Sequence, residues 1–254
     1  MGRNIELTET GQLALSYADE IFSLGGELDE MLQNLPNGRP LVFKVGVADV
    51  VPKSSACRLL APALQLPEPV RIICRENSIE ALLADLAVHR IDLVITDGPI
   101  PSGLNVRGFN HSLGVCSLTF FATPKLAHRL SGAPFLLPDE TTEVRGQHQK
   151  WFDKHSIYPH IVGEFDDSAL MKAFGRTGTG IFIAPTPITE EVEKQYDVVA
   201  IGQTDEVRDH FYAISVERKI SHPAVAAITE TARDWLDPSE PRRPVRKTKS
   251  RKKL

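Results

Sequence analysis

Carboxylates and other oxygen-bearing side chains follow several apolar runs in this sequence. In open parallel sheets, ligands bind beyond the carboxyl ends of the strands, where loops and helix starts converge. This rule selects the following candidate ligand-binding residues: Asp49, Glu76, Asn77, Asp97, Asp166, Asp167, Ser168 and Thr186. Because carboxylates dominate the set and hard oxygen ligands suit hard cations, it predicts a cation site.

Each acidic candidate also has a purely structural interpretation. Asp166 or Asp167 is well placed to cap the helix that follows, and Asp97 is a good turn residue. Asp49 could cap a helix near Pro52. If the carboxylates do converge, their mutual repulsion raises the pKa of at least one of them or recruits a cation. The sequence leaves both interpretations open.

Motifs that would indicate catalysis or a cofactor are missing. The histidines lack HExxH spacing, and no G-x-S-x-G elbow is found. The glycine-rich stretch at residues 175–180 lacks the Gly-Lys-Ser/Thr ending of a phosphate loop and follows a helical pattern instead of opening one. Cys57, Cys74 and Cys116 form no CxxC pair, so we expect reduced thiols and no structural zinc. We predict that the protein is not an enzyme and uses no cofactor.

Short apolar runs alternate with helical patterns from residue 41 onward, and these elements would position the candidate residues. Strands are predicted at residues 41–47, 70–74, 91–97, 116–123, 134–138, 160–165, 180–185, 197–202 and 210–217. Helices are predicted at residues 54–66, 78–88, 143–155, 166–174 and 222–236. Such alternation is typical of βαβ units and predicts an α/β fold with a mostly parallel sheet.

The first segment predicts a long helix that begins after Thr8 and ends before the breakers at residues 36–40. Its apolar residues alternate at spacings of three and four: Ala14, Tyr17, Ile21, Leu24, Leu28, Met31 and Leu35. This heptad seam favours a helix that packs lengthwise on another helix. We therefore predict a linker and dimerisation helix within residues 1–39, with Tyr17, Ile21, Leu24, Leu28 and Met31 at the contact. The alternative is an amphipathic helix that lies on its own domain.

Charge is distributed unevenly along the 254 residues. The net charge is −4, but residues 237–254 hold eight Lys or Arg and two acids, which leaves −10 on the rest of the chain. An acidic body is poorly suited to grip phosphates, and the basic, proline-containing tail predicts disorder. Residues 1–10 are polar where a signal peptide needs an apolar core, and no apolar run reaches membrane length. We expect a cytoplasmic protein with no membrane partner.

Two stretches resemble the LysR-type transcriptional regulators. Residues 7–22, LTETGQLALSYADEIF, are similar to the end of the family's DNA-binding wing and the start of its linker helix. Residues 82–97, LLADLAVHRIDLVITD, resemble a helix–strand passage of the family, with His89 at a position that is usually glycine. Within the family, the NhaR type, which regulates Na⁺/H⁺ antiporter genes, is most similar. That similarity rests on VGVAD at 45–49, on His89, on residues 163–175 and on residues 181–186.

The resemblance implies a two-lobed effector-binding domain like the periplasmic binding proteins, preceded by the long linker helix. The implied boundaries are residues 40–236 for the domain, 41–113 with 218–236 for lobe one, 114–208 for lobe two, and 116–123 and 210–217 for the crossovers. Two crossovers allow hinge closure around an effector. The family's winged helix-turn-helix would lie upstream of Met1, so DNA would be bound through a domain absent from this chain.

The implied function is control of transcription, as an activator that responds to Na⁺ or pH and works as a homo-oligomer, either dimer or tetramer. The candidate residues then become an effector site, with Na⁺ expected at Asp49, Asp97 or Asp166. A regulator that senses an organic anion and a solute-binding protein are the alternatives. The heptad seam and the polar start of the chain disfavour a solute-binding protein.

Overall fold

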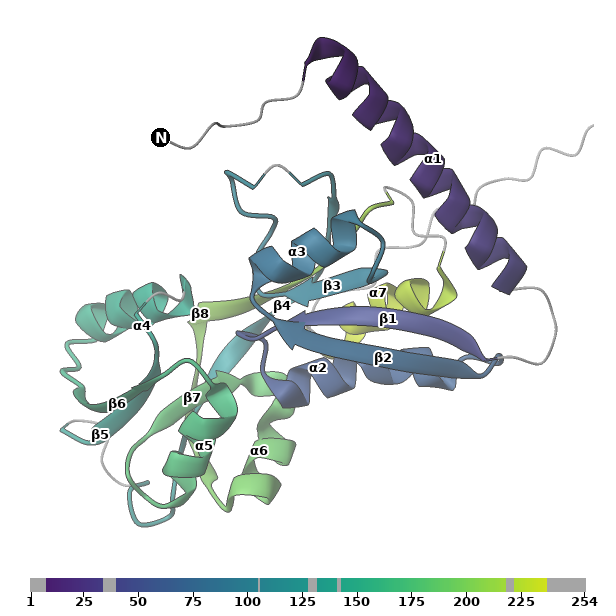
Figure 1. Cartoon of the computed structure of the whole chain (residues 1–254). Coiled ribbons are helices and arrows are strands. Elements are labelled where there is room, and N and C mark those ends of the chain that lie inside the picture. The colour runs from purple at the N-terminus through teal and green to yellow at the C-terminus, as the bar shows by residue number, and fades with distance from the viewer. Residues whose placement is uncertain are drawn as a thin grey trace, which may run out of the picture.

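The computed structural model describes residues 8–33, 40–104, 106–127, 132–140, 143–217 and 222–236. Two α/β lobes lie next to each other, and a long helix stands apart from them (Figure 1). Along the chain the elements are α1 (Glu9–Gln33), β1 (Leu41–Ala48), α2 (Lys53–Leu60), η1 (Ala61–Gln65), β2 (Val70–Asn77), α3 (Ile79–Ala87), β3 (Leu93–Thr96), β4 (Phe109–Ala122), β5 (Pro134–Pro138), α4 (Glu143–Lys154), β6 (His160–Phe165), α5 (Ser168–Arg176), β7 (Phe182–Pro185), η2 (Thr186–Ile188), α6 (Thr189–Tyr196), β8 (Val199–Ser215) and α7 (Pro223–Leu236).

A six-stranded sheet in the order β2-β1-β3-β8-β4-β7 runs through both lobes, and β5 pairs with β6 in a second sheet. The prediction of a mostly parallel sheet holds for β2, β1 and β3 and for β5 and β6. It is wrong for the centre, where β8 lies antiparallel to both β3 and β4, and β4 antiparallel to β7. The reason is topological, because the chain leaves the first lobe along β4 and returns along β8.

The two crossing strands are longer than the sequence predicts. The expected strands at residues 197–202 and 210–217 are one continuous strand, β8, and β4 begins at Phe109 instead of residue 116. The polar run at residues 203–210 hides this continuity. Most of that run is exposed, but Thr204 and Val207 are buried. Thr204 and Arg208 pair with the consecutive residues Leu118 and Ser117 of β4, so residues 205–207 form an irregularity in the ladder.

Separate hydrophobic cores lie on either side of this crossing. One core includes Phe43, Leu83 and Ile95 with Cys116 of β4 and Phe211 of β8. A second core begins close by on the same strands, at Leu118 of β4 and Val207 of β8. A third core contains Phe121, Met171, Phe182 and Val198 under α5 and α6. The crossing strands β4 and β8 therefore contribute side chains to the cores of both lobes.

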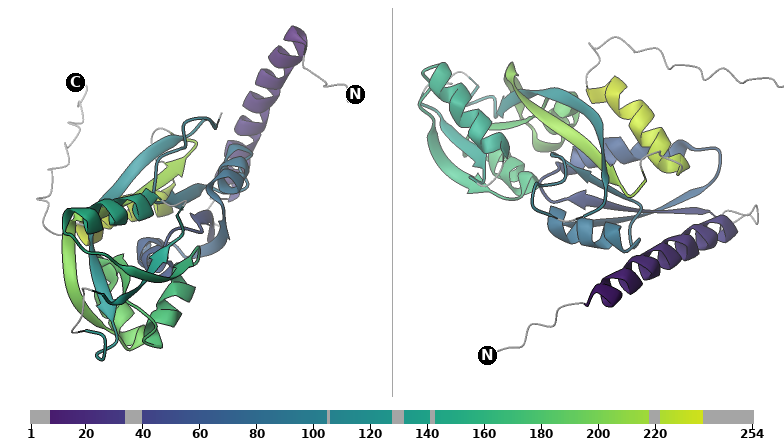
Figure 2. Two further views of the ribbon diagram at one scale, coloured as in Figure 1. Left: turned by 90° about the vertical axis from the view of Figure 1, so that its left-hand side faces the viewer. Right: turned by 90° about the horizontal axis from the view of Figure 1, so that it is seen from above.

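Helix α1 projects away from both lobes (Figure 2). The Thr8 hydroxyl accepts a hydrogen bond from the Gly11 backbone N–H at 3.1 Å, which confirms the predicted helix start. Tyr17, Ile21 and Leu24 are 60%, 68% and 70% exposed. These three seam residues are therefore not buried against the lobes in this structure. No helix in the described residues is long and apolar enough to cross a bilayer.

Some predicted features lie outside the described residues. These are the helix breakers before residue 40, the side chains of Met31 and Leu35, the start of the returning segment at 218–221 and the basic tail at 237–254. The division into lobes at the predicted residue numbers stays a prediction.

Gly175 of α5 allows that helix to approach the sheet closely. A Cβ atom added there would lie 2.2 Å from Cδ1 of Phe182, a fully buried ring on β7. Gly146 of α4, by contrast, is exposed, and an added Cβ would meet nothing within 4 Å.

We expect the same substitution to have opposite effects at these two glycines. Gly175→Ala should lower the free energy of unfolding by about 1–3 kcal/mol, because the helix and Phe182 must move apart. Gly146→Ala should raise it by about 0.5–1 kcal/mol, because alanine loses less backbone entropy in a helix. Urea unfolding of both variants measures this, and equal effects of one sign would contradict the packing described.

Candidate functional site

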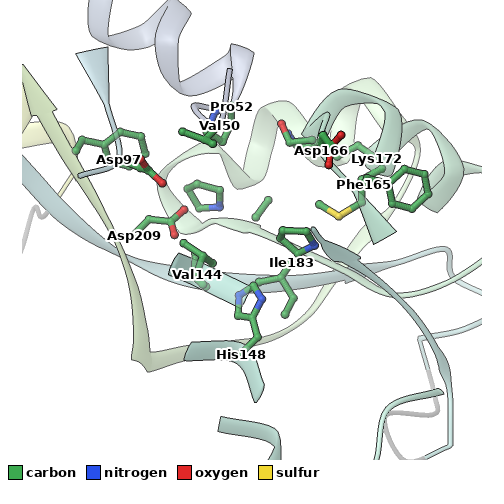
Figure 3. Close-up of a pocket in the computed structure, with 17 residues that line it drawn as sticks. Val50, Pro52, Asp97, Val144, His148, Phe165, Asp166, Lys172, Ile183 and Asp209 are labelled. Atoms are coloured by element: carbon green, nitrogen blue, oxygen red, sulfur yellow. The ribbon is translucent and has the colours of Figure 1, made fainter. Parts of the chain in front are cut away.

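A cavity lies between the lobes, where side chains from both of them face one another (Figure 3). Its empty space, including the open mouth, is ≈ 720 Å³. Apolar side chains form most of its wall: Val50, Pro52, Leu118, Pro138, Val144, Phe165, Met171, Ile183, Ala184, Pro185 and Phe211. The polar residues of the wall are Asp97, His148, Asp166, Ser168, Lys172 and Asp209. An apolar pocket with a few convergent polar groups is typical of a small-molecule site.

Asp209 of β8 and Asp97, which follows β3, lie near each other on one side of the cavity (Figure 3). Burial and, to a smaller extent, the nearby Asp97 carboxylate raise the pKa of Asp209 to about 7, against a partly offsetting effect of Lys172. Oδ1 of Asp209 is excluded from solvent and has no hydrogen-bond partner among the described residues. The Thr96 hydroxyl donates to Asp97 at 3.3 Å. Asp209 is therefore poised to change its charge near neutral pH.

Lys172 of α5 supplies the buried positive charge of the cavity. Its side chain is 2% exposed, and its Nζ donates a hydrogen bond of 3.4 Å to Oγ of Ser168. Burial lowers the pKa of Lys172 to about 8, while Asp167 and Asp209 act in the opposite direction. The lowered pKa means that its surroundings do not fully compensate the ammonium.

His148 of α4 is the third buried titratable residue of the wall. Burial, with a further contribution from Arg145, lowers the pKa of His148 to about 4, so its imidazole is neutral at pH 7. Both ring nitrogens are excluded from solvent and lack a hydrogen-bond partner within the described ranges. Arg145 is held by Glu164, with Nη2 3.1 Å from Oε1.

Of the residues selected from the sequence, Asp97, Asp166 and Ser168 line the cavity. Asp166 is exposed and lies near its mouth, whereas Asp97 is half-buried. The rule that ligands bind beyond strand ends thus places residues of both lobes at one cavity.

The remaining selected residues do not line this cavity, and most of them have local partners. Oδ1 of Asp49 accepts from the backbone N–H of Val50 at 2.9 Å. Glu76 forms an ion pair with Lys53. These contacts hold the side chains at the end of the sheet of the first lobe.

Asn77, Asp167 and Thr186 have similar roles. Oδ1 of Asn77 accepts from the Ser78 N–H at 2.9 Å. Asp167 is the N-cap of α5 and accepts from the Ala169 N–H at 2.7 Å, as its structural interpretation predicts. The Thr186 hydroxyl lies 3.0 Å from Oγ of Ser117 and 2.9 Å from Oγ1 of Thr119, and it lines a different pocket.

Lys172, Asp209 and His148 are not among the residues selected from the sequence, although two of them leave a pattern there. Lys172 falls on the apolar face of α5 with Met171 and Gly175, where a lysine is unusual. Asp209 alternates with Val207 and Phe211, which marks it as facing the core side of β8. Within the described residues no group of three or more His, Cys, Asp or Glu is arranged to hold a metal ion.

Comparisons with known proteins agree with this architecture. A model of the LysR substrate binding domain matches residues 37–237. The transcriptional activator protein NhaR of Escherichia coli (strain K12) is 35% identical over 235 residues, which cover 91% of this chain and 78% of that protein.

Two solved structures share the fold at low sequence identity. DarR of Vibrio fischeri, solved in complex with DNA, has a TM-score of 0.56 at 16% identity over 91% of this chain and 80% of that one. The effector binding domain of QuiR in complex with shikimate has a TM-score of 0.55 at 14% identity over 79% and 99% of the two chains. The predicted α/β, periplasmic-binding-protein-like fold is confirmed.

The buried carboxyl of Asp209 should make stability depend on pH. Between its ordinary pKa of 3.8 and about 7, the folded protein keeps a proton that the unfolded chain releases. Stability should therefore fall as pH rises through this window, by up to about 1.4 kcal/mol per pH unit. Asp209→Asn should remove that loss, so that its advantage over the original chain grows from pH 4 to pH 7 and then levels off.

Urea unfolding at several pH values measures this difference. His148, whose lowered pKa acts in the opposite direction at acidic pH, is common to both proteins and cancels. Asp205→Asn, at an exposed position of the same strand, provides the control. An advantage of Asp209→Asn that does not vary with pH would show that Asp209 titrates normally.

Proposed function

The chain belongs to the LysR-type transcriptional regulators, because it contains their substrate-binding domain, and we propose that it is the effector-binding and oligomerisation part of a transcription activator. Members of this family are not enzymes. The role of activator follows the name of the Escherichia coli relative. DNA would be bound by a winged helix-turn-helix module joined to the first helix, as the resemblance of residues 7–22 implies.

The observation that carries the proposal is the cavity between the lobes. Val50, Pro52 and Asp97 reach it from the first lobe, and Phe165, Met171 and Lys172 from the second. A ligand that touches both walls makes more contacts when the lobes close, and it therefore shifts the population toward the closed state. The crossing strands β4 and β8 would act as the hinge.

We propose Na⁺ or the proton as the signal. Asp209 and Asp97 place two carboxylates close together, and Asp209 titrates near neutrality. A proton or a cation relieves the repulsion between them, so Na⁺ and H⁺ would compete for one place. Asp166, at the mouth of the cavity, would attract the cation. Asp49, which the sequence also suggests as a Na⁺ ligand, accepts from the Val50 backbone and does not line the cavity. The proposed cation site therefore contains Asp209 in its place.

An organic anion is the second candidate, and a specific observation favours it. Lys172 is a buried cation that forms no ion pair with any carboxylate in the described residues. The apolar wall would cover the carbon skeleton of such a ligand.

Oligomerisation is proposed from α1. The apolar side chains of Leu15, Tyr17, Ile21, Leu24 and Leu28 are at least half exposed, which is costly for a helix that stays alone in water. Pairing with α1 of a second chain would bury the heptad seam. A dimer or tetramer would then transmit closure of the lobes to the DNA-bound modules.

Thermal unfolding in Na⁺, Li⁺ or K⁺ at constant ionic strength tests the signal. We expect Na⁺ to raise Tm by a few degrees at pH 8 and by less at pH 6, because the proton occupies the same carboxylates. Asp97→Asn should abolish the Na⁺ effect, and Asp205→Asn should retain it. Equal responses to the three cations would indicate screening alone and leave the organic anion as the signal.

Light scattering tests the oligomer. Leu24→Glu places a charge in the seam and should reduce the mass toward that of one chain, 28.1 kDa. Gln12→Glu adds the same charge to α1 outside the seam and should leave the mass unchanged. A mass that neither variant alters would mean that α1 does not hold the chains together.

A further inference from the structure

The cavity is lined by charged groups of both signs, which are buried or half-buried. Asp209 and Asp97 form its negative side, and Lys172 forms its positive side. Asp209 and Lys172 affect each other's pKa, so the two sides lie within electrostatic reach of each other. They do not form an ion pair, however, and Oδ1 of Asp209 has no hydrogen-bond partner in the described part of the chain. Within the described residues, Oδ1 of Asp209 and the ammonium of Lys172 thus lack an oppositely charged partner, which a ligand can supply.

The wall around these charges suits an organic side chain. Phe165, Met171 and Ile183 of the second lobe and Leu118 of the crossing strand β4 are apolar. The cavity leaves ≈ 80 Å³ for the centres of water-sized molecules, which is several times what one water or a bare ion needs. His148 is 3% exposed and neutral at pH 7, so it adds no charge to this part of the wall. A ligand that fills the cavity must therefore have a carbon skeleton.

We infer that the cavity binds a zwitterionic α-amino acid with an apolar side chain. Its ammonium group donates to the carboxylates of Asp209 and Asp97, and its carboxylate accepts from Nζ of Lys172 and the hydroxyl of Ser168. The side chain lies against Phe165, Met171 and Ile183. This inference rests on the proposed effector-binding role of the cavity and names the chemical class of the effector.

The charge balance of the cavity separates the zwitterion from ligands with one charge. An organic amine would pair with Asp209 and leave the buried ammonium of Lys172 without a partner. An organic acid would pair with Lys172 and leave the carboxyl of Asp209 unsatisfied. An unpaired buried charge is costly, whereas an α-amino acid carries both groups on one carbon and satisfies both at once. Asp166 is exposed, so water screens its charge and it weighs little in this balance.

Calorimetric titration of the full 254-residue chain with matched probes tests the inference. L-phenylalanine, 2-phenylethylamine and 3-phenylpropanoate share an aromatic body and differ in their charged groups. L-leucine, isoamylamine and 4-methylpentanoate form a second set with a smaller body. In the set whose body fits, we expect the amino acid to bind at least tenfold more tightly than its amine or its acid.

Two substitutions assign the charges, and both replace a buried charged group by a neutral one of similar size. In Lys172→Met, the amino acid should bind no more tightly than the amine; in Asp209→Asn, it should bind no more tightly than the acid. Asp205→Asn, which removes a carboxylate from an exposed position of β8, should change none of the affinities. Unchanged urea unfolding midpoints, or raised ones, would show that the variants are folded.

Any other pattern of affinities overturns the inference. An amine that binds as tightly as the amino acid, without dependence on Lys172, would make the cavity a cation site. An acid that binds as tightly, without dependence on Asp209, would make it a site for organic anions. If neither substitution affects any probe but Na⁺ still stabilises the chain through Asp97, only this inference fails. If Na⁺ has no effect either, the proposed effector role of the cavity fails with it.

Discussion

The antiparallel pairing of β4 with β8 is the constraint on which the rest of the structure depends. Every residue of the second lobe lies between these two strands in the sequence, so both lobes are fixed by their ladder. The strands exchange one hydrophobic core for another between Cys116 and Leu118 and between Val207 and Phe211. Asp209 lies within that interval. The site's most perturbed carboxyl thus lies on the segment that joins the two lobes.

The electrostatics of the cavity favour ligand binding over stability. Asp209, Lys172 and His148 all have pKa values displaced toward the neutral form, and burial is the largest cause for each. A fold selected for stability alone would fill these positions with apolar side chains, because the attraction between buried charges seldom offsets the cost of removing them from water. Three such groups around one cavity concentrate that cost between the lobes, where a bound ligand would relieve it.

Much of the fold could be predicted from apolar runs, but the site only in part. Strand β1 and helix α4 differ from their predicted ranges by a single residue at one end, because the spacing of apolar residues within each segment determines its bounds. Asp97 and Ser168 were found because they follow such elements. Asp209 was missed because it lies inside a strand whose polar exposed face masks the alternation. Lys172 is not predicted because the rule of strand ends selects the start of its helix, at Asp167 and Ser168, and not the buried face that follows.

The ion pair that Arg58 forms between the lobes is weak enough for a ligand to overcome. Arg58 of α2 reaches across to the second lobe, with Nη1 2.7 Å from the Pro187 carbonyl and Nε 3.2 Å from Oε1 of Glu191. Both charged side chains are 40% exposed or more, and such pairs contribute only about 0.2–1 kcal/mol. Shifting a two-state equilibrium from 1:99 to 99:1 requires about 5.5 kcal/mol of differential binding. Satisfying two unpaired buried charges is the contribution that makes a change of this size attainable for a small effector.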